Sequence, residues 1–268
     1  MKTLIAKALL TALPRSKPEG RPHWLTRFNF EFMDLENVPN SLKYTLRDIL
    51  DVGSSTPFRG YNRWVASCIY EYSKKKNITN IVELGAGGAP ITRHLIEQYS
   101  DWDVTFTITD LNPDALHFKK LEQADKRVRA ILEPVDFSKK LNGFENSLLV
   151  LSAAFHHIPE ENKKNILAKL KSISPHVMIF EPVCPNSKSI LMNFGILFTG
   201  LATPLFKLNS KSIFRNLFWC WLFPIAPLLL LWDGNISAMR CWSKAKWLSQ
   251  EPKAEVTEYA TCAKIQIV

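Results

Sequence analysis

Two alternating periodicities divide the central part of the chain into strands and helices. Short apolar runs rich in β-branched residues alternate with longer stretches in which apolar residues recur at helical spacing. The predicted strands are NIVELG, VTFTITD, VRAILEPVDF, SLLVLSAAF and HVMIFEPV. These strand–helix alternations predict an α/β fold, with a doubly wound, mostly parallel sheet and helices on both of its faces.

The intervening helices carry start signals. APITRHLIEQYS begins beside Pro90, and PEENKKNILAKLKSI opens with Pro159 and two acidic residues, which the helix dipole favours. NPDALHFKKLEQA is expected to begin with Asn112 as its N-cap and Pro113 in its first turn.

Two further helices are predicted ahead of the first strand. The first has apolar residues at helical spacing, namely Leu42, Leu46, Ile49 and Leu50. The second places one apolar face on Trp64, Val65, Cys68 and Ile69. Gly53 is expected to break the chain between the two.

The first 30 residues differ from the rest. We expect a short amphipathic helix that ends near Pro14, followed by an extended basic arm over residues 15–30. Lys7 interrupts the apolar start and no small-residue cleavage site follows, so a secretory signal is disfavoured.

Residues 182–232 form an apolar stretch without any Asp or Glu. Its two most hydrophobic runs, ILMNFGILFTGLATPLF and LFWCWLFPIAPLLLLW, fall slightly short of the roughly 20 residues of a spanning helix. An interfacial helix pair or a lid over an apolar pocket is therefore favoured over a membrane span. The basic residues of the stretch are Lys188, Lys207, Lys211 and Arg215.

The pattern predicts four parts along the chain. They are an N-terminal arm with covering helices (1–78), a Rossmann-like core (79–185), a hydrophobic basic helical insertion (186–243) and a C-terminal strand region (244–268).

Composition narrows the class of protein. A 268-residue chain with 46% hydrophobic residues is long enough to bury one sizeable core. Its formal charge of +9 suits binding to nucleic acid or to anionic lipid, or it only keeps the protein in solution. The five cysteines show no CxxC spacing, so we expect no metal site, no disulfide framework and a reducing, cytoplasmic location.

A glycine-rich turn, VELGAGGAP, follows the first predicted strand. Gly85 and Gly87 allow the backbone to approach a ligand without a Cβ clash. The third glycine of a dinucleotide fingerprint is replaced by Pro90, which lacks an N–H donor, so a nicotinamide or flavin site is disfavoured.

Acidic residues follow three predicted strands, where ligands of such sheets bind. Glu83 precedes the glycines, Asp110 ends the second strand, and Asp136 with Phe137 follows the third. A carboxylate can accept from both hydroxyls of a ribose, and an acid beside an aromatic ring can hold adenine. This set suits a nucleoside ligand that carries no phosphate.

With these motifs, residues 80–185 resemble a class I S-adenosylmethionine (SAM)-dependent methyltransferase. The first motif, E-x-G-x-G-x-(G/A), corresponds to Glu83, Gly85, Gly87 and Ala89, and ITDLNPDAL, EPVDF, LLVLSAAFHHIPEENKKNIL and VMIFEPV follow in order. The flanks WDGNISAMRCWS and EFMDLENVPNSLK are similar to those of a bacterial, small-molecule type subgroup of the superfamily.

The resemblance implies a seven-stranded type of sheet with SAM as cofactor. The implied cofactor-binding residues are Glu83, Gly85, Ala86, Gly87, Asp110, Leu111, Asp136, Phe137 and Ser152. Family members usually close the sheet with a β-hairpin. The C-terminal segment here is short, AEVTEYATCAKIQIV, so the second strand of that hairpin is in doubt.

Three residues are catalytic candidates. His156 and His157 follow the fourth strand and Glu181 ends the fifth. Either histidine could act as a base or orient the acceptor; in the alternative, one packs on the cofactor and the other caps a helix. A sulfonium methyl group is already activated, so no single catalytic residue is required.

The predicted activity is methyl transfer to a small, apolar or lipid-like acceptor. The insertion suggests peripheral contact with the inner face of a membrane through residues 186–232. Two alternatives stay open: a non-catalytic methyltransferase-fold module anchored at a membrane or partner, and a nucleic-acid methyltransferase. SAAF stands after the fourth strand in place of an NPPY-type motif, so no nucleic acid partner is expected. The sequence does not define an oligomeric state.

Overall fold

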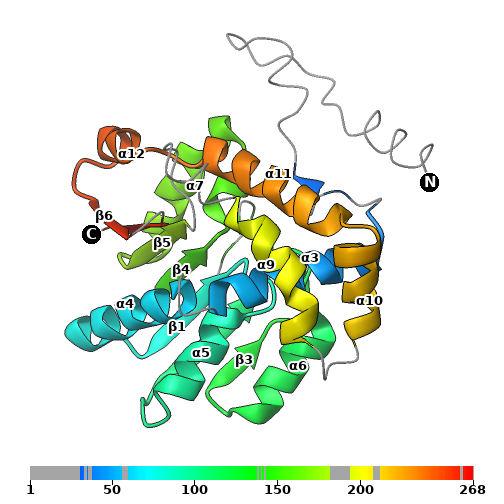
Figure 1. The fold of residues 1–268 in the computed structure, drawn as a ribbon. Coiled ribbons are helices and arrows are strands. Elements are labelled where there is room, and N and C mark those ends of the chain that lie inside the picture. Colours follow the sequence, from blue (N-terminus) through cyan, green and yellow to red (C-terminus); the bar gives the residue numbers. More distant parts are fainter. Residues whose placement is uncertain are drawn as a thin grey trace. The chain divides into compact units, whose positions relative to one another are not determined.

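The structure is a computed structural model of the chain (Figure 1). It describes residues 31–32, 35, 38–55, 60–137, 139, 141, 143–181, 194–207, 212–259 and 262–267. The predicted N-terminal helix and basic arm, together with Lys188 and Lys211, lie outside the described residues.

The chain forms two compact units, each built from two segments. We call Ser54–Asn186 with Arg240–Val268 the sheet unit, and Met1–Gly53 with Ser187–Met239 the helical unit. The four predicted parts of the chain remain a prediction.

The sheet unit contains a seven-stranded sheet in the order β3-β2-β1-β4-β5-β7-β6. Its parallel strands are β1 (Asn80–Leu84), β2 (Thr105–Thr109), β3 (Val128–Ala130), β4 (Leu148–Ser152) and β5 (Val177–Glu181). The closing hairpin is β6 (Glu255–Tyr259) and β7 (Cys262–Ile267), with β7 antiparallel to β5. All five predicted core strands and the predicted α/β class are therefore confirmed.

Helices connect the strands and cover the sheet. They are α4 (Tyr61–Lys76), α5 (Pro90–Gln98), α6 (Ala115–Ala124), the 3-10 turn η2 (Phe155–His157), α7 (Glu160–Ile173) and α12 (Lys244–Gln250). Alternate strand residues enter two hydrophobic clusters: Val150 packs with residues of α4, α5 and α6, and Leu151 packs with residues of α7 and α12. The strand period of two thus supplies both faces of the sheet with apolar side chains.

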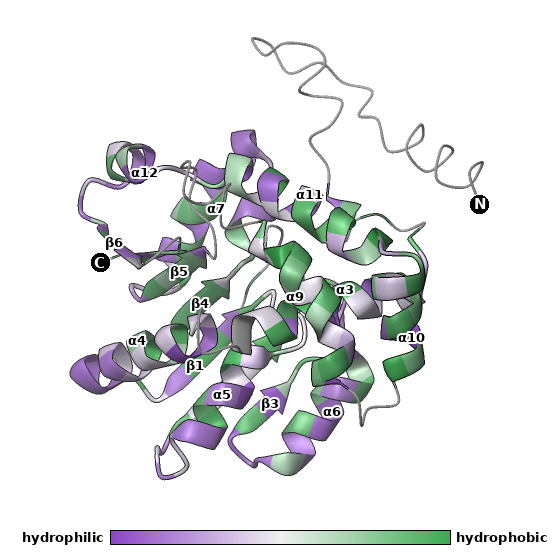
Figure 2. Cartoon of the chain, in the orientation of Figure 1, coloured by the Kyte–Doolittle hydropathy of each residue, from purple (hydrophilic) through white to green (hydrophobic). Residues whose placement is uncertain are grey.

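The helical unit is built from α3 (Asn40–Ser55), α9 (Gly195–Phe206), α10 (Ile213–Leu217), the π-helical turn η3 (Phe218–Leu222) and α11 (Ile225–Arg240). Its core is formed by Val38, Leu42, Leu46, Ile49, Ile196, Cys220, Ala226 and Leu230. Figure 2 shows the predominantly hydrophobic colouring of α9, α10 and α11. The two helices predicted ahead of the first strand, α3 and α4, and the hydrophobic helical insertion are confirmed.

Polar groups fix α3 to the inserted helices. The Thr45 hydroxyl donates to Asn216 over 3.2 Å, and the Asn216 amide donates to Asp48 over 2.9 Å. Asp48 also pairs with Arg215, and Asp51 pairs with Lys207 at 3.1 Å. Both acids therefore neutralise basic residues of the insertion.

Gly200 marks a close approach of α9 and α11. A Cβ added at Gly200 would lie 2.5 Å from Cγ of Pro227, so only glycine fits there. Within the described residues, no single helix has the length and apolar content for a membrane crossing. The segments Ile213–Leu222 and Ile225–Arg240 meet that test only together, with a bend of 78° between them.

Four sequence expectations need correction. Gly53 lies inside α3 and does not break it, because helix propensity is a weak preference that packing overrides. Leu50 is 41% exposed and does not belong to the buried stripe of its helix. The N-cap of α6 is Asp114, since its carboxylate accepts the N–H of His117, while Asn112 lies in the preceding turn. Both strands of the C-terminal hairpin are present.

Candidate functional site

The glycine-rich turn connects β1 to α5 at the carboxyl end of the parallel strands. Gly85 and Gly87 adopt left-handed backbone angles, with φ of +71° and +58°. The N–H of Ala86 donates to the carbonyl of Thr109 over 2.8 Å, which holds the turn beside the end of β2. A Cβ added at Gly87 would meet no atom within 4 Å, so the backbone there is open to a ligand.

Asp110 lies directly against this turn, as its position after β2 predicts. Its Oδ2 atom accepts the N–H of Gly87 over 2.7 Å, and its Oδ1 atom accepts the N–H of Asn112 over 2.8 Å. These bonds fix the carboxylate in the turn. Each oxygen keeps a further lone pair, so the group can still accept from hydroxyls.

The contact between Asp110 and Gly87 also disfavours a phosphate ligand. The N–H of Gly87 is already engaged, and a negative carboxylate stands beside the open backbone. A phosphate group could not accept a hydrogen bond from this N–H, and the negative charge of the carboxylate would repel it. The turn thus suits a neutral, hydroxyl-bearing group.

Glu83 is buried, and its side chain reaches the first turn of α5. Its Oε2 atom accepts the hydroxyl of Thr92 over 2.6 Å and the N–H of Thr92 over 3.3 Å. Burial raises the pKa of Glu83 from 4.5 to about 7, and the nearby Asp110 acts in the same direction. The carboxyl group therefore joins β1 to α5, and its predicted ligand contact stays a prediction.

The other predicted cofactor residues lie on the loops that follow β1, β2 and β3 and at the end of β4. Ala86 is buried in the turn, and Leu111 is 53% exposed beside Asp110. A Cβ added at Gly85 would lie 3.8 Å from the Phe137 ring, so that ring lies next to the glycine turn. Asp136 forms an ion pair with Lys139 at 3.2 Å.

Ser152, at the end of β4, lies beside a buried tyrosine. Its Oγ atom is 3.0 Å from the hydroxyl of Tyr61, which also donates to the carbonyl of Phe180. Burial raises the pKa of Tyr61 well above its ordinary value, so this hydroxyl stays protonated.

His156 and Glu181, two of the three catalytic candidates, form a buried pair. The Nδ1 atom of His156 lies 2.5 Å from Oε2 of Glu181, and the backbone N–H of His156 donates to Oε1 over 3.1 Å. A carboxylate only accepts, so the ring donates from Nδ1 to Glu181. His157 is exposed, with its ring centre 4.3 Å from that of His156.

Cys241 completes this buried cluster. Its Sγ atom lies 3.5 Å from Oε2 of Glu181. One ligand atom from each of His156, Glu181 and Cys241 lies within 4.8 Å of the others, a set of N, O and S donors that could hold a metal ion such as Zn²⁺. In the same geometry the three groups satisfy one another by hydrogen bonds.

Two participants of the site were missed in the sequence. Thr92 lies in the first turn of α5 and belongs to no recognisable motif. Its partner Glu83 stands nine residues earlier in the chain. Cys241 stands 60 residues beyond Glu181, with no metal-type spacing to signal it. Both contacts arise from tertiary packing and leave no local pattern.

No protein-family model matches the sequence, and no curated protein matches it. Solved structures with a similar fold include three methyltransferases. Mitomycin 7-O-methyltransferase is 12% identical with a TM-score of 0.43, and the match covers 84% of this chain and 53% of that one. This chain thus spans about half the length of that enzyme.

The second is the plantazolicin methyltransferase in complex with SAH, at 10% identity and a TM-score of 0.43, covering 82% of each chain. The third is coclaurine N-methyltransferase bound to N-methylheliamine and SAH, at 11% identity and a TM-score of 0.47, covering 79% of this chain and 74% of that one. Sequence identities and TM-scores at this level do not indicate what this chain binds.

Proposed function

We propose that this chain is a SAM-dependent methyltransferase that acts on a small, apolar or lipid-like acceptor. The observation that carries the proposal is the contact of the Asp110 carboxylate with the N–H of Gly87. It combines an acceptor for ribose hydroxyls with a backbone that is open to a ligand and unsuited to phosphate.

The residues around this contact fit the nucleoside part of SAM. Asp110 would accept from the ribose hydroxyls, and Gly85 and Gly87 would let the backbone approach the ligand. Phe137, next to the glycine turn, would pack on the adenine face, and Asp136, Leu111, Ala86 and Ser152 complete the proposed contacts. When bound, SAM supplies a methyl group already activated by its sulfonium.

His156 is the proposed proton acceptor of the reaction. Glu181 accepts from both the ring and the backbone of His156, which fixes the tautomer and the orientation of the imidazole. A base held in this way can take the proton that an acceptor hydroxyl or amine loses on methylation. Glu181 is then a positioning residue, and the exposed His157 would contact the acceptor.

The apolar character of the acceptor is proposed from the insertion that follows β5. Residues 182–232 contain no acid, and the helices of this insertion expose many large apolar side chains. Such a segment suits an acceptor met at a cytoplasmic membrane surface through residues 186–232.

Calorimetry on the full chain tests the cofactor first. We expect SAM and SAH to bind and NAD⁺ not to bind, since the turn disfavours a pyrophosphate. Absence of SAM binding at millimolar concentration would overturn the enzyme proposal. The acceptor is then sought by incubating protein with methyl-labelled SAM and a bacterial lipid extract, and by counting label in the organic phase.

A further inference from the structure

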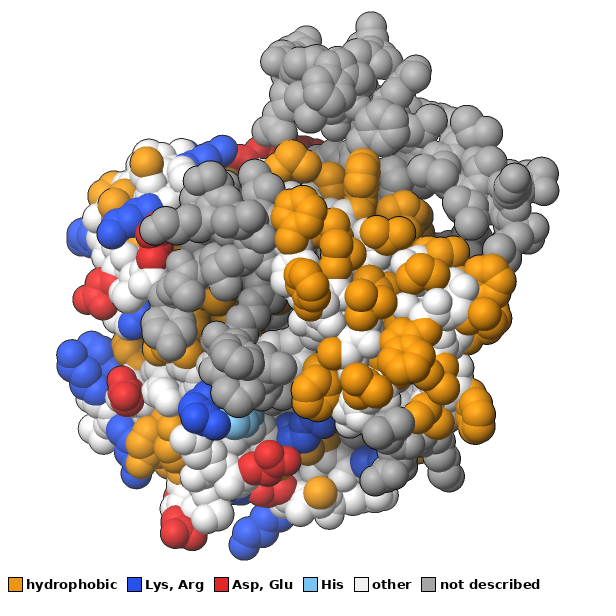
Figure 3. All heavy atoms as spheres, viewed as in Figure 1, with side chains coloured by type: hydrophobic (Ala, Val, Ile, Leu, Met, Phe, Trp, Pro, Cys, Tyr) orange, Lys and Arg blue, Asp and Glu red, His pale blue; other side chains and the backbone are white. Residues whose placement is uncertain are grey.

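The helical unit exposes a continuous set of large apolar side chains on α9, α10, η3 and the start of α11 (Figure 3). We call this set the apolar face. Its members are Phe194, Phe198, Leu201, Leu205, Phe206, Phe214, Phe218, Trp221, Leu222, Phe223 and Leu228. Soluble surfaces rarely gather so many side chains of this kind in one patch.

We propose that the apolar face inserts into the interfacial layer of a bilayer that contains anionic lipid. This inference deepens the proposed apolar acceptor and rests on that proposed function, because it names the surface through which the chain would meet lipid. It commits to a lipid bilayer as the occupant of the face.

The shape of the apolar face favours a fluid partner over a protein. Phe214 is 82% exposed and Phe198 is 76% exposed, so their rings protrude from the surface. Protein interfaces place such aromatic anchors in complementary pockets. A bilayer needs no preformed pocket, because lipid chains rearrange around protruding rings.

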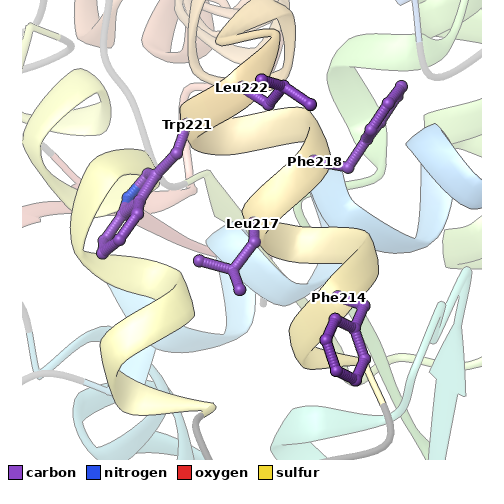
Figure 4. A pocket seen from close by; sticks show the side chains of 5 residues that line it. All are labelled: Phe214, Leu217, Phe218, Trp221 and Leu222. Carbon is purple, nitrogen blue, oxygen red and sulfur yellow. The ribbon is translucent and has the colours of Figure 1, made fainter.

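The α10–η3 segment adds an open apolar hollow of about 490 Å³ (Figure 4). It is lined by Phe214, Leu217, Phe218, Trp221 and Leu222. The Trp221 N–H donates to the carbonyl of Leu201 over 2.8 Å, which satisfies its polar atom and leaves an apolar lining. This hollow is part of the apolar face and widens its apolar surface.

Arg47 supplies the positive charge at the border of the apolar face that complements an anionic surface, because Asp48 already neutralises Arg215. Tyr44 is 45% exposed, and the guanidinium groups of Arg47 and Arg215 lie 5.9 Å and 5.6 Å from its ring centre. Arg215 follows Phe214 in α10, so this group borders the apolar face. Tyrosine and arginine are residue types that anchor proteins at the headgroup level.

The helix geometry favours insertion without a crossing. Within the described residues only the bent pair Ile213–Leu222 and Ile225–Arg240 has enough apolar length, and the pair turns by 78°. Asp233 is buried and accepts the N–H of Phe32 over 2.7 Å, so α11 carries an acid engaged inside the unit. A carboxylate at this position disfavours placing α11 at the bilayer centre.

Flotation of the full chain with lipid vesicles tests the proposal without any SAM. We expect the chain to float with phosphatidylcholine–phosphatidylglycerol vesicles and to float less with phosphatidylcholine alone. The double variant Phe198→Ser/Phe214→Ser should lower the partition coefficient at least tenfold, since it removes two protruding rings. Arg47→Gln should weaken only the preference for the anionic vesicles.

A matched control is Leu116→Ser/Leu248→Ser, which removes two exposed leucines of the sheet unit and should float like the wild type. Thermal melts confirm that each variant is folded. A wild type that stays unbound to both vesicle types overturns the proposal, as does a Phe198→Ser/Phe214→Ser variant that floats unchanged. If the wild type binds no vesicles but self-associates in sedimentation, and the Phe198→Ser/Phe214→Ser variant does not self-associate, the apolar face is instead an interface with a second copy of the chain. Because SAM is absent, failure to float is distinct from failure of the methyltransferase proposal.

Discussion

The Nδ1 atom of His156 lies 2.5 Å from the Oε2 atom of Glu181, and both side chains are only about 3% exposed. We expect Glu181→Gln to lower methyl transfer at least tenfold, because a glutamine amide does not fix one tautomer of the ring. The measurement is transfer of label from methyl-labelled SAM to the lipid extract, together with SAM affinity by calorimetry.

A structural role and a positioning role predict different results for this pair. If Glu181 only supports packing, SAM affinity and thermal stability should fall together with transfer. If it positions a base, SAM affinity should be retained, and imidazole should partly restore transfer to His156→Ala. Full transfer by His156→Ala would remove the base assignment.

Asp110 is expected to be essential for SAM binding. Asp110→Ala removes the proposed acceptor of the ribose hydroxyls and should abolish binding measured by calorimetry. Asp114→Ala is the matched control, since it removes a nearby acid that caps α6 and should cost about 1 kcal/mol of stability without loss of SAM. Affinity retained within about threefold in Asp110→Ala contradicts the ribose assignment; such a change is under about 1 kcal/mol.

Gly87 and Gly88 should respond differently to alanine. Gly87 has a φ of +58° and Gly88 has no positive φ, while neither would place a Cβ within 4 Å of another atom. Gly87→Ala should cost about 1–2 kcal/mol of stability and weaken SAM binding at least tenfold, because its backbone faces SAM in the proposed complex. Gly88→Ala should retain both properties. Equal SAM affinities in the two variants would argue against close approach at Gly87.

The raised pKa of Glu83 makes the stability of the sheet unit depend on pH. Between pH 4.5 and about 7 the unfolded state loses this proton and the folded state keeps it. The unfolded state then binds fewer protons, so the free energy of unfolding falls as pH rises, by about 3 kcal/mol in total, and levels off above about pH 7.

Urea unfolding of wild type and Glu83→Gln across this pH window measures the effect. We expect a flatter pH dependence in the variant, since glutamine does not ionise. Glu97→Gln changes an exposed acid of α5, the helix that Glu83 contacts through Thr92, and should keep the wild-type slope. Parallel slopes for wild type and Glu83→Gln would show that Glu83 does not carry the dependence.

Periodicity predicted the sheet well because its core strands are short apolar runs whose residues are buried on both faces. Leu148 and Val150 enter one cluster, while Leu149 and Leu151 enter the other. Boundaries were less predictable. Asn112 is a good N-cap by residue type, but the side chain of Asp114 caps the helix, so α6 begins later, at Ala115.

The geometry of the candidate site was predictable where it follows strand ends and unpredictable where it depends on packing. Asp110 and Gly87 meet because neighbouring parallel strands end at one edge of the sheet. The orientation of Glu83 toward Thr92 required the fold, since an acid after a strand can turn either to the ligand or to a helix start. The contact of Cys241 with Glu181 joins residues 60 positions apart, and only the tertiary structure reveals it.

The close fit of Gly200 against Pro227 has a spectroscopic consequence for the apolar face. Because α9 and α11 are already folded and locked at this contact, the face does not need to gain helix when it meets lipid. Amphipathic peptides that fold on the bilayer lose backbone entropy at that step, whereas a preformed unit has lost it on folding. The far-UV circular dichroism of this chain should therefore stay constant on addition of vesicles, even where flotation shows binding.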